Sequence, residues 1–193
     1  MRARLTAVVA VVALSSVPAF ADTLQVFKEI QKQINHYAYF SIFDNVNVGI
    51  DEIGVVTLTG SVTNPFKKRA IEKRVSNVDA VLAVNNQVEV LPLSRFDNRL
   101  RYQVARAIYG HPSLGQYVRA YPSINIVVKR GHVTLTGVVN TESDEIIALS
   151  QVRRLGAFSV TSELRTSAEA EAELERLGQI RTTRRVVPPA AVS

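Results

Sequence analysis

Residues 55–62 read VVTLTGSV, and residues 132–139 read HVTLTGVV, so the same motif recurs at an offset of 77 residues. Such self-similarity identifies an internal repeat. Upstream of each copy, apolar residues alternate with polar or small ones, and Gly54 or Gly131 marks a turn before the motif. This period of two predicts a hairpin in each copy, with one face of its strands buried. The alternating residues are Val46, Val48 and Ile50 in the first copy and Ile124, Ile126 and Val128 in the second.

A helical segment is predicted after each hairpin. In the first copy Asn64 is a good N-cap and Pro65 suits the first helical position. In the second copy Thr141 and Asp144 resemble a capping box. Apolar residues at helical spacing predict the buried sides of these helices. They are Ala70, Ile71, Val75 and Val78 in the first copy, and Ile146, Leu149, Val152 and Leu155 in the second.

Another helix precedes each hairpin, and a last strand closes each copy. The order helix, strand, strand, helix, strand predicts an α+β protein of two tandem αββαβ modules, each a small sheet packed by two helices. The modules span about residues 23–91 and 94–166, and the short connection between them suggests that they touch. Within residues 167–193 we expect a helix over 168–178 and a disordered tail. The first helices are marked by Val26, Ile30 and Ile34 and by Phe96, Leu100, Val104 and Ile108; the last strands by Val84, Val88 and Val90 and by Val160 and Leu164.

The N-terminus is typical of a secretory signal. Arg2 and Arg4 precede an apolar run, and Ala19-Phe20-Ala21 fits the pattern that signal peptidase accepts. We therefore expect residues 1–21 to be a signal peptide cleaved after Ala21, leaving a periplasmic protein; an uncleaved membrane anchor is the alternative, and the apolar run is short for it. The chain contains no cysteine, which excludes disulfides, thiol nucleophiles and a lipid anchor on cysteine.

The repeated motif also carries a resemblance. Val56-Thr57-Leu58-Thr59-Gly60 with Val81, Val84 and Asn85, and Val133-Thr134-Leu135-Thr136-Gly137 with Val160, resemble the BON domain. The chain is thus similar to exported, osmotically inducible tandem BON-domain proteins. That resemblance implies the αββαβ fold, a periplasmic location, and a link to phospholipid binding and envelope integrity under stress. In tandem BON proteins, lipid contact is tied to the helical face of one domain.

The second copy departs from the pattern of the first in two places. It has Thr161-Ser162 where the first copy has Asn85-Asn86, and it inserts residues 110–122 before its first strand. Gly60 and Gly137 are interpreted as structural, suiting a bulge or a close approach by the packed helix.

The positive charge of the chain lies in its second half. Residues 94–166 carry ten Lys or Arg against five Asp or Glu, whereas residues 22–93 carry seven against eight. On a helical wheel, one stripe of the helix from Arg95 collects cationic and tyrosine side chains. Arginine pairs well with phosphate and tyrosine suits a membrane interface, so this stripe is a candidate lipid-binding face. An ordinary solvated helix face is the alternative. The stripe comprises Arg95, Arg99, Tyr102, Arg106 and Tyr109.

Two other groups of residues have both a binding and a structural interpretation. A second basic group lies on the helix after Pro65, and it suits an acidic lipid or polymer. The aromatic residues after the first helix suit a membrane wedge, the core, or a contact between the modules. The basic group is Lys67, Lys68, Arg69, Lys73 and Arg74, and the aromatic residues are Tyr37, Tyr39, Phe40 and Phe43.

The sequence carries no sign of catalysis. His36, His111 and His132 lack the spacing of a metal site, and no serine stands in a nucleophile-elbow motif. We expect no enzyme activity, no metal or other cofactor, no small-molecule substrate and no nucleic-acid partner. Two functions remain: peripheral binding of anionic phospholipid membranes in support of envelope integrity or stress tolerance, and an adaptor that binds other envelope proteins. Steep weakening by salt would favour the first.

Overall fold

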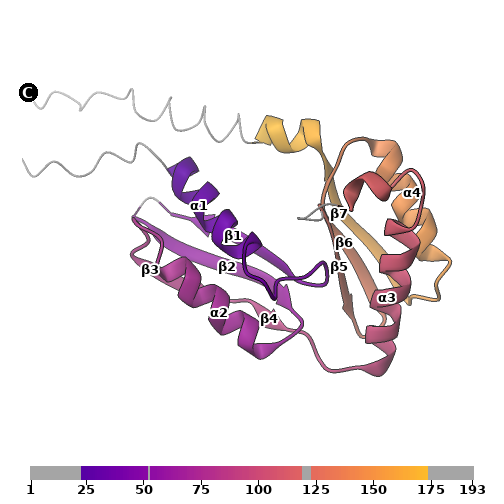
Figure 1. The fold of residues 1–193 in the computed structure, drawn as a ribbon, viewed down its shortest axis with the longest axis horizontal. Coiled ribbons are helices and arrows are strands. Elements are labelled where there is room, and N and C mark those ends of the chain that lie inside the picture. Colours follow the sequence, from indigo (N-terminus) through magenta and orange to yellow (C-terminus); the bar gives the residue numbers. More distant parts are fainter. Residues whose placement is uncertain (1–22, 52, 119–122, 174–193) are drawn as a thin grey trace, which may run out of the picture.

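The computed structural model describes residues 23–51, 53–118 and 123–173 and shows the predicted α+β architecture of two similar modules (Figure 1). The first module consists of α1 (Thr23–Asn35), β1 (Asn45–Ile50), β2 (Val55–Val62), α2 (Pro65–Ser76), β3 (Ala83–Asn86) and β4 (Glu89–Val90). The second consists of α3 (Arg95–Tyr109), the 3-10 turn η1 (Gly115–Tyr117), β5 (Ile124–Lys129), β6 (His132–Val139), α4 (Glu142–Arg153) and β7 (Ser159–Thr166). The expected signal peptide and tail lie outside the described residues.

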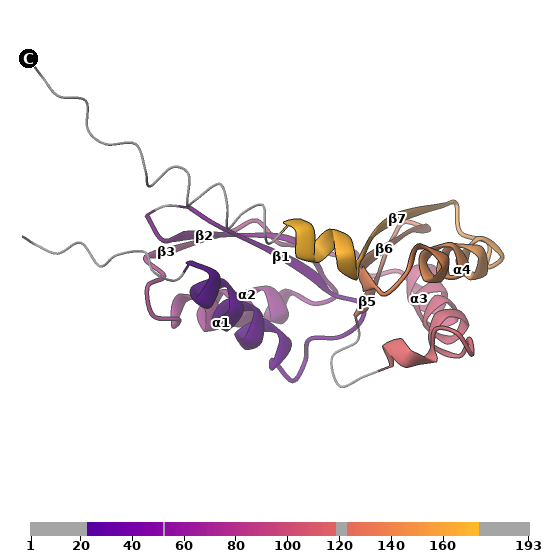
Figure 2. The same cartoon turned by 90° about the horizontal axis from the view of Figure 1, so that it is seen from above.

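Each module contains one small sheet with the same topology. β1 and β2 form an antiparallel hairpin, and β2 pairs in parallel with β3 and β4 after the crossover through α2. β5 and β6 likewise form a hairpin, and β7 returns parallel to β6 through α4. Figure 2 shows α1 and α2 together on one side of the first sheet.

The closing strand of the first module is interrupted, whereas the sequence suggested one continuous strand. The side chain of Asn86 accepts the N–H of Val88 at 3.2 Å and donates to the backbone of Lys68 and to Glu72 on α2. These bonds turn the chain away from the ladder, so that β3 ends at Asn86 and β4 begins at Glu89.

Two apolar clusters, one per module, form the core. The first contains Ile30, Ile34, Val56, Leu58, Ile71 and Val75, and the second contains Leu100, Val104, Ile108, Ile126, Leu135 and Val152. Two residues predicted on the buried stripes are instead exposed: Ile146 by 63% and Phe96 by 48%. In both helices an acid close to the exposed apolar residue is buried instead, Asp97 in α3 and Asp144 in α4.

The glycine of each repeated motif is required by the hairpin itself. Gly60 has φ +104° and Gly137 has φ +121°. A Cβ at these positions would overlap the carbonyl oxygen of Asn45 or Ser123, at the start of the paired strand. The close neighbour is therefore the adjacent strand and not the packed helix that the sequence suggested.

The two modules are in contact through the segment between α1 and β1. Ile42 and Phe43 pack against the core of the second module, and the N–H of Ile126 donates to the carbonyl of Ile42 at 2.7 Å. An exposed ion pair between Lys129 and Glu89 also joins the modules. The aromatic residues after α1 therefore divide: Phe43 contacts the other module, whereas Tyr37 is buried in the first core.

Among the described residues, no helix combines the length and the apolar character that crossing a membrane requires. In the insertion of the second module, Leu114 and Tyr117 are buried, and residues 119–122 lie outside the described part.

Candidate functional site

Helix α3 carries the candidate stripe, and local chemistry defines its start. Ser94 caps it by accepting the N–H of Asp97 at 3.1 Å, and Asp97 adds a negative charge to the first turn. Leu100, Val104 and Ile108 follow at a spacing of four residues and are buried in the second core. The opposite side of α3 must therefore face outward.

Two buried charged residues fix the rotation of α3 against the sheet. The carboxylate of Asp97 accepts the N–H groups of Arg130 and Gly131, which form the β5–β6 turn. The guanidinium of Arg101 donates to the carbonyl of Val128 at 2.6 Å. Burial lowers the pKa of Arg101, and the nearby charge of Asp97 opposes that effect. Sequence reasoning did not single out this pair, although both residues share the wheel face of Leu100 and Val104.

The structure brings part of the predicted stripe together at the surface. Arg95, Arg99 and Arg106 are exposed, and Tyr102 is 68% exposed. Among the described residues, none of the three arginines forms an ion pair. Their charges are therefore available to a partner. An open groove of about 470 Å³ lies between α3 and the turn that follows α4, and it is lined by Arg99, Tyr102, Gln103, Arg106, Ala107 and Leu155.

Tyr109 departs from this outward stripe. Its hydroxyl donates to the backbone carbonyl of Ile124, at the start of β5. Burial raises the pKa of Tyr109, so the phenol stays protonated over the ordinary pH range. Tyr109 thus fastens the end of α3 to the sheet, and its hydroxyl is committed to the protein backbone.

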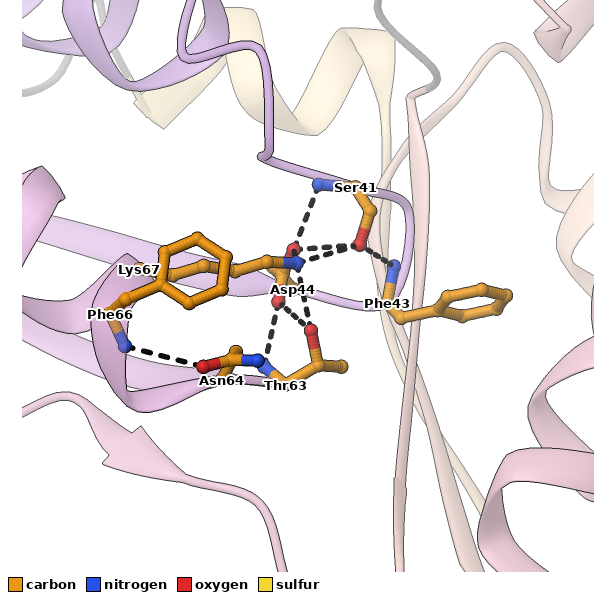
Figure 3. A network of polar contacts seen from close by, with 7 residues as sticks. All are labelled: Ser41, Phe43, Asp44, Thr63, Asn64, Phe66 and Lys67. Atoms are coloured by element: carbon orange, nitrogen blue, oxygen red, sulfur yellow. Dashed lines mark hydrogen bonds and ion pairs between the residues drawn. The ribbon is translucent and has the colours of Figure 1, made fainter. Parts of the chain in front are cut away.

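The second basic group, on α2, is divided by the fold. Lys67 is buried in an ion pair with Asp44 (Figure 3). Arg74 lies over the ring of Tyr37, with its guanidinium carbon 4.9 Å from the ring centroid. Lys73 lines an open groove between α1 and α2 together with Arg74 and Tyr37. The five cations therefore do not form one surface.

A polar network at Asp44 anchors the segment that joins the modules. Its carboxylate accepts the backbone N–H and the hydroxyl of both Ser41 and Thr63, and the ammonium of Lys67 at 2.7 Å (Figure 3). Asp44 has no exposed surface. Five donors thus satisfy a fully buried charge. They also fix the residues Ile42 and Phe43 that reach the second module.

In the second module, an acid stands at the position that corresponds to Lys67. Counted along the repeat, Asp144 on α4 takes the place of Lys67 on α2. Its carboxylate accepts the hydroxyls of Tyr117 at 2.7 Å and Thr141 at 2.9 Å, and the hydroxyl of Tyr117 accepts the N–H of Asn140. Tyr117 comes from the insertion, which therefore contacts the start of α4, while Thr141 is the N-cap of that helix.

The described residues contain no group of three or more His, Cys, Asp or Glu side chains able to hold a metal ion. At the surface, Nδ1 of His132 and the hydroxyl of Ser159 are 2.7 Å apart. Within the described part of the chain, no acidic side chain contacts His132 or Ser159 to orient them. The geometry of a nucleophile with its base is thus incomplete there.

The comparison with protein families agrees with the repeat. The family model of the BON domain matches residues 25–92 and again residues 97–168. No curated protein sequence matches the chain. Two solved structures, both of CdsD, a structural protein of the type III secretion system of Chlamydia trachomatis, are similar at 16% identity. For the C-terminal domain of CdsD the TM-score is 0.31, with 82% of this chain and 73% of that chain covered. For the other the TM-score is 0.30, with 78% and 97% covered.

The family match covers both modules and most of the chain. Its two ranges follow the two sheets and their helices, α1 to β4 and α3 to β7. The repeated hairpin glycines, the antiparallel strand pair and the parallel crossover occur in both ranges. The chain therefore belongs to the BON-domain family, with two domains in tandem, and this membership indicates a non-enzymatic role associated with the cell envelope.

Proposed function

We propose that the mature protein acts in the periplasm and binds the surface of anionic phospholipid membranes peripherally, supporting envelope integrity or stress tolerance. The observation that carries the proposal is the outer face of α3. There Arg99 and Arg106 flank Tyr102 along an open groove, with no acid paired to either arginine among the described residues. Planar guanidinium groups pair well with phosphate, and each basic group near an anionic surface contributes about 1 kcal/mol.

The two modules differ in the way that this proposal requires. The second module, residues 94–166, carries ten basic and five acidic residues, whereas the first module, residues 23–91, carries seven of each. In the first module Lys67 is neutralised by Asp44, and Arg74 is placed over Tyr37. We therefore assign membrane contact to the second module.

The test is sedimentation with vesicles. The protein is exported with its own leader, purified from the periplasm and mixed with vesicles of phosphatidylcholine containing increasing shares of phosphatidylglycerol. Binding should increase with the anionic share and weaken steeply as salt rises, because it depends on exposed charge. Changing Arg95, Arg99 and Arg106 to Glu should abolish it.

The matched control is Lys73→Glu with Arg74→Glu, which reverses charge at the corresponding groove of the first module and should leave binding close to that of the wild type. If the wild-type protein stays in the supernatant at every lipid composition, the membrane function is wrong. A search for an envelope protein as partner would then follow, because an adaptor with an apolar interface should resist salt.

A further inference from the structure

One end of the second module carries large apolar side chains in the open. It lies where the linker enters α3, at the lower end of this module in Figure 1. Phe158, in the loop between α4 and β7, is 73% exposed, and Phe96 on α3 is 48% exposed. Their rings stack with centroids 5.8 Å apart. Neither ring has a place in the core, so the pair is a surface feature that the fold itself does not require.

The aromatic pair is held rigidly. The N–H of Phe158 donates to the carbonyl of Gly131 at 2.9 Å, and Gly131 belongs to the turn that Asp97 fixes. Gly131 has φ +81°, and a Cβ there would collide with the ring of Phe158. Glycine therefore allows the ring to lie over the turn. Because α3, the turn and the loop are bonded together, Phe158 cannot retreat into the module.

The surroundings of the pair are strongly basic. The three segments that meet there, residues 93–99, 129–133 and 153–160, carry six lysines or arginines and a single acid, Asp97. Asp97 is 1% exposed and its carboxylate is occupied by backbone N–H groups. Lys129 is paired with Glu89. The exposed charge around the rings is therefore positive, and the exposed basic residues are Arg95, Arg99, Arg130, Arg153 and Arg154.

We propose that Phe96 and Phe158 form a wedge that inserts into the interfacial layer of an anionic bilayer, while the surrounding arginines pair with lipid phosphates. The combination of protruding aromatic rings and an all-cationic rim matches a surface that is negative outside and apolar beneath. This inference rests on the membrane binding proposed above. It adds an apolar, salt-resistant contact and tells which end of the protein enters the lipid.

The first module supplies a natural control at the corresponding position. The N–H of Leu82 donates to the carbonyl of Gly54 at 2.9 Å, as that of Phe158 does to Gly131, and Leu82 is 75% exposed. Its surroundings are the opposite in charge. Residues 51–54 and 76–83 carry three acids and no lysine or arginine. The end of the first module should therefore be repelled by an anionic membrane.

The experiment uses tryptophan fluorescence, because the chain contains no tryptophan. Phe158→Trp and Leu82→Trp each place a single reporter at matched positions in the full protein. Vesicles contain equal parts of phosphatidylcholine and phosphatidylglycerol, with bromine atoms on the acyl chains of the phosphatidylcholine as quenchers. We expect the emission of Phe158→Trp to shift to the blue and to be quenched on binding, and that of Leu82→Trp to stay unchanged.

A second variant separates insertion from charge. Phe96→Ser with Phe158→Ser removes two exposed rings and should leave the circular dichroism spectrum intact. It should weaken vesicle binding at least about tenfold and remove the part of the binding that survives high salt. If the wild type sediments with vesicles but Phe158→Trp shows no shift and the serine variant binds equally well, the wedge is wrong and the membrane function stands. If the wild type does not bind vesicles at all, both proposals fail.

Discussion

Asp44 and Lys67 form a buried ion pair across 2.7 Å that ties the segment before β1 to the first turn of α2. The same segment carries Ile42 and Phe43, which pack against the core of the other module. One polar network in the first module thus holds the contact by which the second module, and with it α3, is oriented. Stability of the pair and the arrangement of the modules should therefore be coupled.

Lys67→Met should destabilise the protein by about 3–5 kcal/mol, because it leaves the carboxylate of Asp44 buried without its cation. The free energy of unfolding is measured by urea denaturation. Lys32→Met is the control, since Lys32 pairs with Glu29 at the surface, and its cost should stay below about 0.5 kcal/mol. Equal, small effects of both variants would show that the buried pair contributes no more than an exposed one.

Phe43→Ala should uncouple the modules. The ring of Phe43 contacts that of Tyr102 at a centroid distance of 5.2 Å and packs on the second core, so its loss removes about 2 kcal/mol of contact between them. Calorimetry should then resolve two unfolding transitions where the wild type shows one. Tyr39→Ala is the control. Within the described residues, the aromatic rings that Tyr39 contacts, those of Tyr37 and Phe66, both belong to the first module. A single unshifted transition for Phe43→Ala would refute the coupling.

The sequence predicted the local structure well because the signals for it are local. The alternation of Val46, Val48 and Ile50, the cap at Asn64 and the glycine of each motif all act within one element or one hairpin. The two errors on the helices have a common origin. Phe96 and Ile146 were expected on the buried sides of their helices but are exposed. Asp97 and Asp144 are buried instead, because their carboxylates accept hydrogen bonds from distant segments, the β5–β6 turn and Tyr117.

The candidate site was predicted only in part for the same reason. A helical wheel places Arg99, Tyr102 and Arg106 on one outward face, and the structure brings them to one groove. A helical wheel cannot reveal that the hydroxyl of Tyr109 bonds to the start of β5. Nor can it reveal that the ring of Phe96 stacks on that of Phe158, which lies in a loop about sixty residues further along the chain. Contacts of that kind follow from tertiary packing, which sequence spacing alone does not encode.

Gly137→Ala should destabilise the second module by at least about 2 kcal/mol. At φ +121° an L-residue is strained, and its Cβ would overlap the carbonyl oxygen of Ser123, which is backbone and cannot rotate away. Thermal or urea unfolding measures the loss, and Gly60→Ala should behave alike in the first module. Gly115→Ala, where nothing lies within 4 Å of a new Cβ, is the control and should be nearly neutral. A neutral Gly137→Ala would mean that the hairpin adapts to a side chain.

Tyr109 should make the protein sensitive to alkali. In the unfolded chain its phenol ionises near the ordinary pKa of 10.0, whereas burial raises that pKa in the fold. Stability from this group is therefore fully present below pH 10.0 and is lost as the pH rises towards the higher pKa of the folded state. We expect the free energy of unfolding to fall more steeply above that pH in the wild type than in Tyr109→Phe.

At neutral pH, Tyr109→Phe should lower the free energy of unfolding by about 1 kcal/mol, because the hydrogen bond to Ile124 is lost. Identical slopes for the wild type and Tyr109→Phe would show that the phenol is not held neutral by the fold.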